Sequence, residues 1–235
     1  MFFRVYKTPS SLEKIKRIKM KKKYKGVIFD MDGVIVDNHH YHFEAWMEFS
    51  RRHNFELNAK IYREKFNGKT NNDLFRMIFG ALTPEVMNSL AEEKEGLYQK
   101  LYFPHMRAHK GLIDFLEFLL HRQFVIGLGT SAPTANVDFT LDNLKLRKYF
   151  NVIVDGSQVE RGKPDPQVYQ LCANRLGLLP RQCIVFEDSL AGLEAGERAG
   201  CSIIAVATSH EAYELKVKTD KIIFDFTEVR GLIEL

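Results

Sequence analysis

Apolar and polar residues follow one another along this chain in two different patterns. The first apolar run, residues 26–29 (GVIF), is short and rich in β-branched and aromatic residues, and acidic residues and a glycine follow it at once. This pattern is typical of a buried strand that ends in a turn. Residues 24–37 are therefore predicted to form one strand and a turn.

From about residue 38 to residue 106 the apolar residues recur at helical spacing instead. Phe43, Trp46 and Met47 belong to one such group, and no strand-like run interrupts the segment. Thr83 followed by Pro84 supplies an N-cap residue and a proline at the first helical position. The pattern predicts an all-helical insert of about four helices over residues 38–106.

After residue 109, short apolar runs alternate with segments of helical spacing. Strands are expected at 124–130, 152–154, 183–186, 202–207 and 222–224, and helices at 112–120, 133–144, 166–176, 189–199 and 227–233. Such alternation favours a parallel sheet with helices on both faces. We therefore expect an α/β fold with a doubly wound, Rossmann-like parallel sheet. Residues 24–37 and 107–235 would form this core domain, and the insert at 38–106 would lie over the end of the first strand as a cap.

Glycines in two of the predicted elements are interpreted as structural. Gly127 and Gly129 lie in a strand without a third glycine, so a dinucleotide-binding fingerprint is not favoured. Gly192, Gly196 and Gly200 recur every four residues on one face of a helix, which indicates that this helix packs closely on the sheet.

Positive charge is concentrated at the start of the chain. Residues 1–23 contain nine Lys or Arg and one acidic residue, so they carry a net charge of +8, whereas the whole chain carries +4. We interpret them as a basic N-terminal extension or the product of an upstream start codon, with a short helix over residues 10–18. A signal peptide is not expected, because no apolar stretch follows the charges. The competing interpretation is an arm that binds nucleic acid or a membrane surface.

The remaining composition is that of an ordinary globular protein of 235 residues. The three cysteines, Cys172, Cys183 and Cys201, lie in apolar surroundings without Cys-x-x-Cys spacing, and we expect reduced core thiols in a cytoplasmic protein. No run of about 18 apolar residues predicts a membrane span. We expect no nucleic-acid or membrane partner, and a monomer, which suits a moving cap.

Four polar segments stand at the ends of predicted strands or in the loops after them. Asp30 and Asp32 are two residues apart, so both point to the same face; taken alone, they would equally suit an acidic turn. The other segments are residues 128–132 (LGTSA), 161–166 (RGKPDP) and 186–189 (FEDS). In a doubly wound sheet these ends line one crevice. Paired carboxylates, hydroxyl and amide donors, one cation and two further acids suit phosphoryl transfer with Mg²⁺.

The four segments, in this order, resemble the motifs of the haloacid dehalogenase-like phosphotransferase superfamily, over about residues 24–230. The position of the helical insert is similar to that of the cap in its β-phosphoglucomutase-like group. The resemblance implies that Asp30 is the nucleophile and forms an aspartyl-phosphate. Asp32 would protonate the leaving oxygen and then activate water or an acceptor hydroxyl. An acid at this position argues against a dehalogenase, since a halide leaves unprotonated.

The same resemblance implies roles for residues of the other three segments. Thr130 and its neighbours Ser131 and Ala132 would hold the phosphoryl oxygens, and Lys163 would offset the negative charge. Read singly, Lys163 also suits a solvated loop lysine and Thr130 a strand-end hydroxyl, and Glu187 with Asp188 suits an N-cap pair. The residues implied for Mg²⁺ are Asp30, the carbonyl of Asp32, and Asp188 with Glu187 behind it.

The helix expected after the first motif carries His39, His40 and His42. A metal site made by these histidines is not favoured, because no acidic or cysteine partner accompanies them at ligand spacing. The resemblance implies instead that His42 and Trp46 lie at the substrate-binding hinge of the cap. It also implies that Lys94 reaches the active site, although the spacing alone would equally suit a solvated helix lysine.

Two positions depart from the pattern of the mutases in this group. Ala132-Pro133 stands where they carry a Ser-Lys pair, and Asn71 stands where they carry a cap arginine, although Lys69 is near. Each missing charged hydrogen bond would weaken binding of a second phosphate by roughly 1.5–3 kcal/mol. We therefore expect a Mg²⁺-dependent phosphatase of a small phosphate ester, such as a sugar phosphate. The alternatives are β-phosphoglucomutase, inorganic pyrophosphatase and a non-catalytic binding module.

Overall fold

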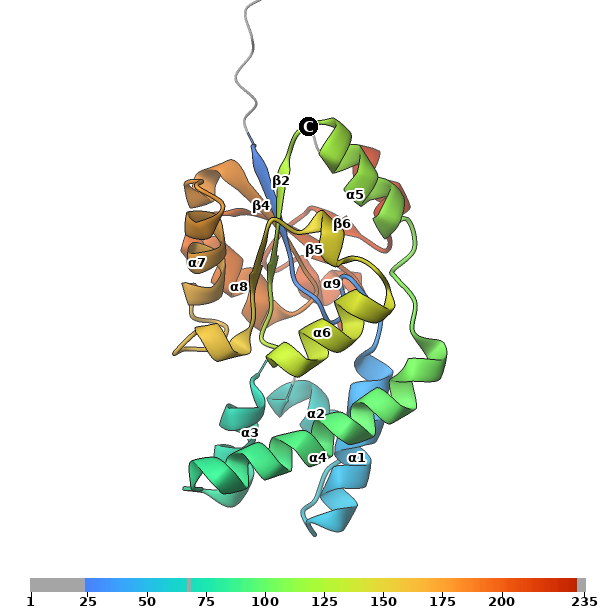
Figure 1. Ribbon diagram of the computed structural model, residues 1–235, viewed down its shortest axis with the longest axis vertical. Coiled ribbons are helices and arrows are strands. Elements are labelled where there is room, and N and C mark those ends of the chain that lie inside the picture. The colour runs from blue at the N-terminus through green and yellow to red at the C-terminus, as the bar shows by residue number, and fades with distance from the viewer. Residues whose placement is uncertain (1–23, 67–68, 232–235) are drawn as a thin grey trace, which may run out of the picture.

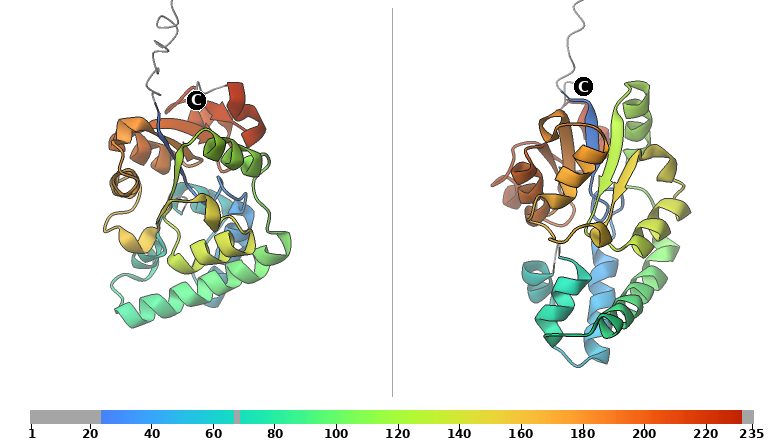
Figure 2. Two further views of the ribbon diagram at one scale, coloured as in Figure 1. Left: turned by 45° about the horizontal axis from the view of Figure 1, so that its top comes forward. Right: turned by 60° about the vertical axis from the view of Figure 1, so that its left-hand side comes forward.

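The computed structural model describes residues 24–66 and 69–231, and Figures 1 and 2 show its arrangement. The short helix expected over residues 10–18 lies outside this range. A six-stranded sheet has the order β3-β2-β1-β4-β5-β6, and all neighbouring strands are parallel. Its strands are β1 (Gly26–Phe29), β2 (Val125–Gly129), β3 (Val152–Val154), β4 (Cys183–Glu187), β5 (Ser202–Val206) and β6 (Ile222–Ile223).

The strand order reverses between β1 and β4, which lie side by side in the middle of the sheet. The chain runs outward on one side through β2 and β3, and on the other side through β5 and β6. In open α/β sheets, the crevice at such a switch point lies outside the carboxyl ends of the strands. The expected doubly wound parallel sheet is confirmed, and its switch point lies where the chain carries Asp30 and Asp188.

Period-two alternation along β1 divides the core into two layers. Val27 and Phe29 face one apolar cluster, whereas Ile28 faces the other. The first cluster includes residues of α5 (Leu112–His121) and α6 (Thr134–Asn143), and the second those of α7 (Gln167–Arg175) and α8 (Leu190–Ala199). Figure 1 shows these two pairs of helices on opposite faces of the sheet. This arrangement agrees with the helices expected on both faces.

The structure differs from the sequence-based expectation near the C-terminus. The helix expected over 227–233 is a 3₁₀-helix, Phe226–Gly231, within the described residues. Its sequence is short and includes β-branched residues, which disfavour a longer α-helix. A short helix that the sequence pattern did not indicate, α9 (Ala212–Leu215), precedes β6.

The segment between β1 and α5 contains four α-helices among the described residues, as expected. They are α1 (His39–Arg52), α2 (Ala59–Lys65), α3 (Asn71–Phe79) and α4 (Pro84–Tyr102). Asn58, Thr70 and Thr83 cap the last three by accepting hydrogen bonds from backbone N–H groups. The four helices have their own apolar cluster around Trp46 and Phe49. They form a separate layer at one end of the sheet, which we call the cap (Figures 1 and 2). Its limits at residues 38 and 106 stay a prediction.

Within the described residues, no helix has the length and apolar character needed to cross a bilayer. All three cysteines are free thiols in or against the second apolar cluster, which confirms their expected place in the core. Burial raises the pKa of Cys183 to about 11 and that of Cys201 to about 12. These thiols are therefore protonated at neutral pH.

Two of the three glycines spaced along α8 allow the close packing that the sequence indicates. A Cβ atom on Gly192 would overlap the Glu187 carboxylate, and one on Gly196 would lie 2.9 Å from Cγ2 of Ile203. Gly200 has a different role from the one expected, because it ends the helix with a φ of 88°. Only glycine adopts this left-handed conformation without steric cost.

Candidate active site

The turn after β1 brings Asp30 and Asp32 to the carboxyl edge of the sheet. The backbone N–H of Asp30 donates to the carbonyl of Phe186 on the neighbouring strand at 3.0 Å. Gly33 follows with a φ of 79°, and a Cβ atom there would overlap the Asp188 carboxylate and the His39 ring. Glycine is therefore required in this turn by both its conformation and its surroundings.

Asp30 lies against the ammonium group of Lys163 at the floor of a cleft. Lys163 Nζ is 2.9 Å from Asp30 Oδ1 and 2.6 Å from Glu187 Oε1, and its side chain is 2% exposed. Burial opposes the charged form of the lysine, but the carboxylates of Asp30 and Glu187 outweigh it and raise the pKa of Lys163. The interpretation of Lys163 as a solvated loop lysine is therefore wrong. Lys163 is a buried cation that offsets the charges of Asp30 and Glu187.

Glu187 lies behind Lys163 and is fully occupied by protein donors. Its Oε1 accepts from Lys163 Nζ and from the Tyr169 hydroxyl at 3.0 Å. Its Oε2 accepts from the backbone N–H groups of Asp188 and Ser189, both at 2.8 Å, and from the Ser189 hydroxyl at 3.0 Å. The carboxylate therefore orients both Lys163 and the turn that presents Asp188.

The floor of the cleft has the composition of a site for a hard cation. Asp30, Glu187 and Asp188 offer carboxylate oxygens that all lie within 4.8 Å of one another. Burial, with Glu187 and Asp188 nearby, raises the pKa of Asp30 to about 8 against the opposing effect of Lys163. A divalent cation bound here would offset the repulsion among these carboxylates and favour the ionised form of Asp30, and carboxylate oxygens are suitable ligands for it.

Asp32 lies on the wall of the cleft and is held by residues of α1 and its N-terminus. Asn38 Nδ2 donates to Asp32 Oδ1 at 2.7 Å, and His42 Nε2 is 3.6 Å from the same oxygen. Burial opposes ionisation of this carboxyl, but His42 and Asn38 lower the pKa of Asp32 to about 2. Asp32 is consequently ionised at neutral pH in the absence of substrate.

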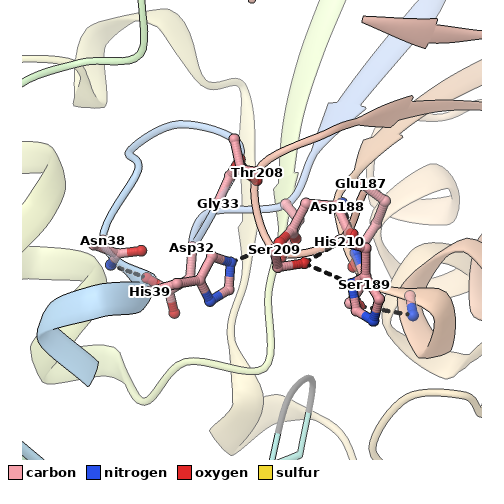
Figure 3. Close-up of polar contacts among 12 residues, drawn as sticks. Asp32, Gly33, Asn38, His39, Glu187, Asp188, Ser189, Thr208, Ser209 and His210 are labelled. Carbon is pink, nitrogen blue, oxygen red and sulfur yellow. Dashed lines mark hydrogen bonds and ion pairs between the residues drawn. The ribbon is translucent and has the colours of Figure 1, made fainter. Parts of the chain in front are cut away.

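His39 is a site residue that the sequence did not indicate. Its Nε2 lies 2.6 Å from Asp188 Oδ2, and Figure 3 shows the two side chains facing each other. Although burial opposes protonation, Asp188 raises the pKa of His39 to about 9. The sequence shows no acidic or cysteine partner at ligand spacing for these histidines, but in the structure Asp188 lies beside His39 and Asp32 lies beside His42.

A loop after β5 also supports this edge of the cleft (Figure 3). The Thr208 hydroxyl donates to the carbonyl of Gly33 at 2.7 Å, and the Ser209 hydroxyl donates to the carbonyl of Asp188 at 2.9 Å. The turn after β1 and the turn after β4 are thereby tied to a third segment.

Thr130 and its neighbours complete the core side of the cleft. Thr130 is buried directly after β2, and its hydroxyl oxygen accepts from the backbone N–H of Ala132 at 3.1 Å. Thr130, Ser131 and Ala132 line the same cleft as Asp30 and Lys163. The four segments singled out in the sequence therefore meet at one place.

Three cap residues named from the sequence, His42, Trp46 and Lys94, line the opposite side of the cleft. The His42 ring stacks on Tyr98 with centroids 3.7 Å apart. Lys94 is 2% exposed, and its Nζ donates to Glu95 at 2.7 Å and lies 3.2 Å from His42 Nδ1. The solvated helix lysine is therefore wrong as an interpretation of Lys94.

The cleft has a volume of about 700 Å³ including its open mouth, and it is lined by both the cap and the core. Several of the residues that line it were not indicated by the sequence. Asn71 was singled out only because the mutases carry an arginine at that position. No local sequence pattern distinguishes the missed residues from ordinary helix residues. The missed residues of the lining include Tyr62, Phe66, Leu74, Glu95 and Asn136.

Comparison with known proteins agrees with this geometry. Residues 27–206 match the family model described as haloacid dehalogenase-like hydrolase. The chain is 33% identical over 177 residues to the phosphorylated carbohydrates phosphatase of Thermotoga maritima, covering 74% of this chain and 81% of that protein. It is 30% identical over 192 residues to the β-phosphoglucomutase of Bacillus subtilis, covering 77% and 83%.

A solved structure, that of the HAD hydrolase of family IA, variant 3, from Entamoeba histolytica, superposes with a TM-score of 0.78 at 27% identity. The superposition covers 87% of this chain and 94% of that one. The similarity thus extends over both the sheet and the cap.

Proposed function

The chain belongs to the haloacid dehalogenase-like hydrolase family, and we propose that it hydrolyses a small phosphorylated carbohydrate through an aspartyl-phosphate, with Mg²⁺ as cofactor. As an enzyme it is a phosphoric monoester hydrolase. The observation that carries the mechanism is the position of Asp30, which faces a shared cleft with Lys163 2.9 Å away and with Asp32 on the adjacent wall.

In the first step, an Asp30 oxygen attacks phosphorus and the bond from phosphorus to the ester oxygen breaks. Asp32 gives its proton to the departing oxygen, so that the product leaves as a neutral alcohol. A dianionic phosphate beside Asp32 disfavours the carboxylate form and raises its pKa in the complex, which supports this role as an acid.

In the second step, the carboxylate of Asp32 takes a proton from water as that water attacks the phosphorus of the aspartyl-phosphate. The bond between phosphorus and Asp30 breaks, inorganic phosphate forms, and both residues return to their starting states. Asp32 can accept this proton because it has just given its own proton to the alcohol.

Lys163 and the loop after β2 hold the phosphoryl group during both steps. The ammonium group of Lys163 offsets charge on Asp30 and on the phosphoryl oxygens, while Glu187 keeps it in place. Thr130, Ser131 and Ala132 line the cleft where donors to the remaining oxygens are needed.

Mg²⁺ suits the cluster of carboxylates at the floor. We assign its binding to Asp30, Asp188 and the carbonyl of Asp32, and we assign Glu187 to positioning Lys163, because protein donors occupy both of its oxygens. When bound, the ion neutralises the repulsion between the phosphate and the carboxylates.

Hydrolysis is favoured over a mutase reaction by the residues that line the cleft. A mutase must hold a bisphosphate intermediate and so needs cations for a second phosphate. Ala132 and Pro133 line the cleft without charge, and Asn71 donates to Glu95 at 2.6 Å. Water is therefore the favoured acceptor.

The test is phosphate release from a panel of sugar phosphates, nucleotides and pyrophosphate with Mg²⁺, by the wild type and by Asp30→Asn. We expect Asp30→Asn to lose at least about 1000-fold in kcat, because the nucleophile is removed. Asp142→Asn, which changes an exposed aspartate paired with Arg147, is the matched control and should retain activity. Turnover by Asp30→Asn at the wild-type rate would exclude the mechanism.

A further inference from the structure

Glu95 is a buried cap carboxylate that the proposed mechanism does not use. It lies on α4 beside Lys94, is 6% exposed and lines the cleft that holds Asp30 and Asp32. A carboxylate of this kind is expensive to bury unless its hydrogen bonds are satisfied. Its partners and its remaining capacity therefore indicate what it can do for a substrate.

The structure supplies three donors to this carboxylate. Glu95 Oε1 accepts from Asn71 Nδ2 at 2.6 Å and from Lys94 Nζ at 2.7 Å. Glu95 Oε2 accepts from Asn136 Nδ2 at 2.6 Å. A carboxylate has about four acceptor positions, so Oε2 retains one for a further donor. Because Glu95 lines the cleft, a substrate hydroxyl group is a suitable donor.

The charges around Glu95 do not suit a second phosphate. The charge of Lys94 is already paired with Glu95, and its ammonium group also contacts His42. Although burial opposes ionisation, Lys94 and His42 hold the pKa of Glu95 below its usual value, so the group is anionic at neutral pH. Lys69, the other lysine of the cap lining, is exposed to water. A second phosphate would thus lie beside the Glu95 carboxylate, whose ion pair keeps the Lys94 ammonium group from binding that phosphate.

Aromatic side chains also contribute to the cap lining. Trp46, Tyr62 and Phe66 line the cleft, and Trp46 and Phe66 pack edge to face with centroids 5.0 Å apart. Flat apolar faces next to a carboxylate and two amides suit a molecule with both C–H surfaces and hydroxyl groups. Carbohydrates and polyols have this combination.

We propose that Glu95 determines substrate specificity by accepting a hydrogen bond from a hydroxyl group of the alcohol half and by repelling a second phosphate. The preferred substrate is then the monophosphate of an otherwise uncharged, hydroxyl-bearing carbohydrate or polyol. This inference rests on the proposed function, because it assumes that the phosphate to be removed lies at Asp30.

A purely structural role for Glu95 makes a different prediction. Its contact with Asn136 joins α4 of the cap to α6 of the core, and Gln99 Nε2 also donates to Asn136 at 3.0 Å. If Glu95 only linked the two layers, its replacement would lower kcat/KM for every ester by the same factor. Ratios of kcat/KM between substrates separate the two roles, because a common factor cancels.

The experiment measures kcat/KM for two matched pairs, fructose 1-phosphate with fructose 1,6-bisphosphate, and glucose 6-phosphate with glucose 1,6-bisphosphate. Phenyl phosphate, which has no hydroxyl group on its alcohol half, is the third kind of probe. The proteins are the wild type, Glu95→Gln, Glu95→Asp and the control Glu92→Gln. Glu92 lies on the same helix but is exposed. Thermal unfolding of each variant reports its folding.

For the sugar monophosphate that the wild type hydrolyses faster, we expect kcat/KM to be at least about 10-fold higher than for the corresponding bisphosphate. We expect it to exceed kcat/KM for phenyl phosphate by at least the same factor. In Glu95→Gln both ratios should fall about 10-fold, because the charge is lost and Lys94 is released to bind an anion. In Glu95→Asp the shorter side chain should lower only the ratio to phenyl phosphate, since the charge remains. Glu92→Gln should match the wild type.

Two results would overturn the inference while leaving the proposed function intact. One is a wild type that hydrolyses the bisphosphates as well as the monophosphates, which needs no variant to observe. The other is a set of Glu95 variants whose ratios stay within threefold of the wild type. A wild type that hydrolyses none of these esters with Mg²⁺, nor any in the wider panel, would instead overturn the proposed function itself.

Discussion

The side-chain amide of Asn38 donates to Oδ1 of Asp32 at 2.7 Å. The same nitrogen donates to the Tyr98 hydroxyl at 2.6 Å, so one buried amide joins Asp32, the proposed acid and base, to α4 of the cap. Asn38 directly precedes α1, at the place where the chain leaves the core for the cap. The position of the cap and the orientation of Asp32 are thus coupled through this residue.

Asn38→Ala is expected to lower kcat about 10- to 100-fold with a smaller change in KM, because Asp32 loses the donor that orients it. Steady-state kinetics with the best ester of the panel would measure this. Tyr98→Phe removes only the cap end of the link and should have a smaller effect on kcat. An Asn38→Ala enzyme with wild-type kcat would show that Asp32 is oriented without this amide.

Removal of divalent metal is expected to abolish activity, and added Mg²⁺ should restore it, because the clustered carboxylates otherwise repel the phosphate. Asp188→Asn should raise the Mg²⁺ concentration needed for half-maximal activity by at least about 10-fold. Titration calorimetry with Mg²⁺ in the absence of substrate provides a second measurement. Full activity in an excess of chelator would contradict the assignment of the metal site.

Gly192→Ala is expected to destabilise the protein by about 2 kcal/mol or more, because the added methyl group would overlap the Glu187 carboxylate. Activity should fall as well, since Glu187 positions Lys163. Urea unfolding would measure the loss. The control is Gly96→Ala on α4, where an added Cβ meets no atom within 4 Å and should stabilise the helix by about 0.5–1 kcal/mol. Equal stability of the two variants would disprove this packing argument.

Asp155 is expected to make folding depend on acidic pH. Its Oδ1 accepts from the backbone N–H of Ser157 at 2.9 Å, and its Oδ2 accepts from the Thr134 hydroxyl at 2.9 Å. Burial opposes ionisation, but these hydrogen bonds hold the pKa of Asp155 below its usual value of 3.8. The stabilisation is therefore complete above the ordinary pKa and is lost as the pH falls through the lowered one.

Asp155→Ala should cost about 1–2 kcal/mol of unfolding free energy at pH 7. The difference between wild type and variant should shrink as the pH falls below 3.8, because the unfolded chain then binds a proton that the folded carboxylate resists. Urea denaturation at a series of pH values would measure both effects. A difference that is the same at pH 7 and pH 3 would show that the ionised form contributes nothing.

Local sequence patterns predicted much of the fold. The apolar run at 26–29, the N-cap at Thr83 and the alternation after residue 109 each depend on neighbours within a few residues, and the corresponding elements are present. The segment at 227–233 was predicted less well: it forms a short 3₁₀-helix, and its β-branched residues disfavour a longer α-helix.

The candidate site residues also divide into those that local sequence motifs indicate and those that they do not. Asp30, Thr130, Lys163 and Asp188 stand in short motifs at strand ends, and the parallel topology alone brings such ends together. His39 and Glu95 stand in no such motif. Their roles follow from Asp188, 149 positions from His39, and from Asn136, 41 positions from Glu95.

The sequence by itself therefore determined the doubly wound sheet, the helical insert and the residues that we propose for phosphoryl chemistry, because hydrophobic periodicity and motif spacing are local properties. Only the tertiary structure decided which cap side chains face the cleft, and that Lys94 is buried as the partner of Glu95 rather than solvated. The physical reason is that burial and charge pairing depend on contacts between distant segments, and these contacts form only when the cap packs against the core.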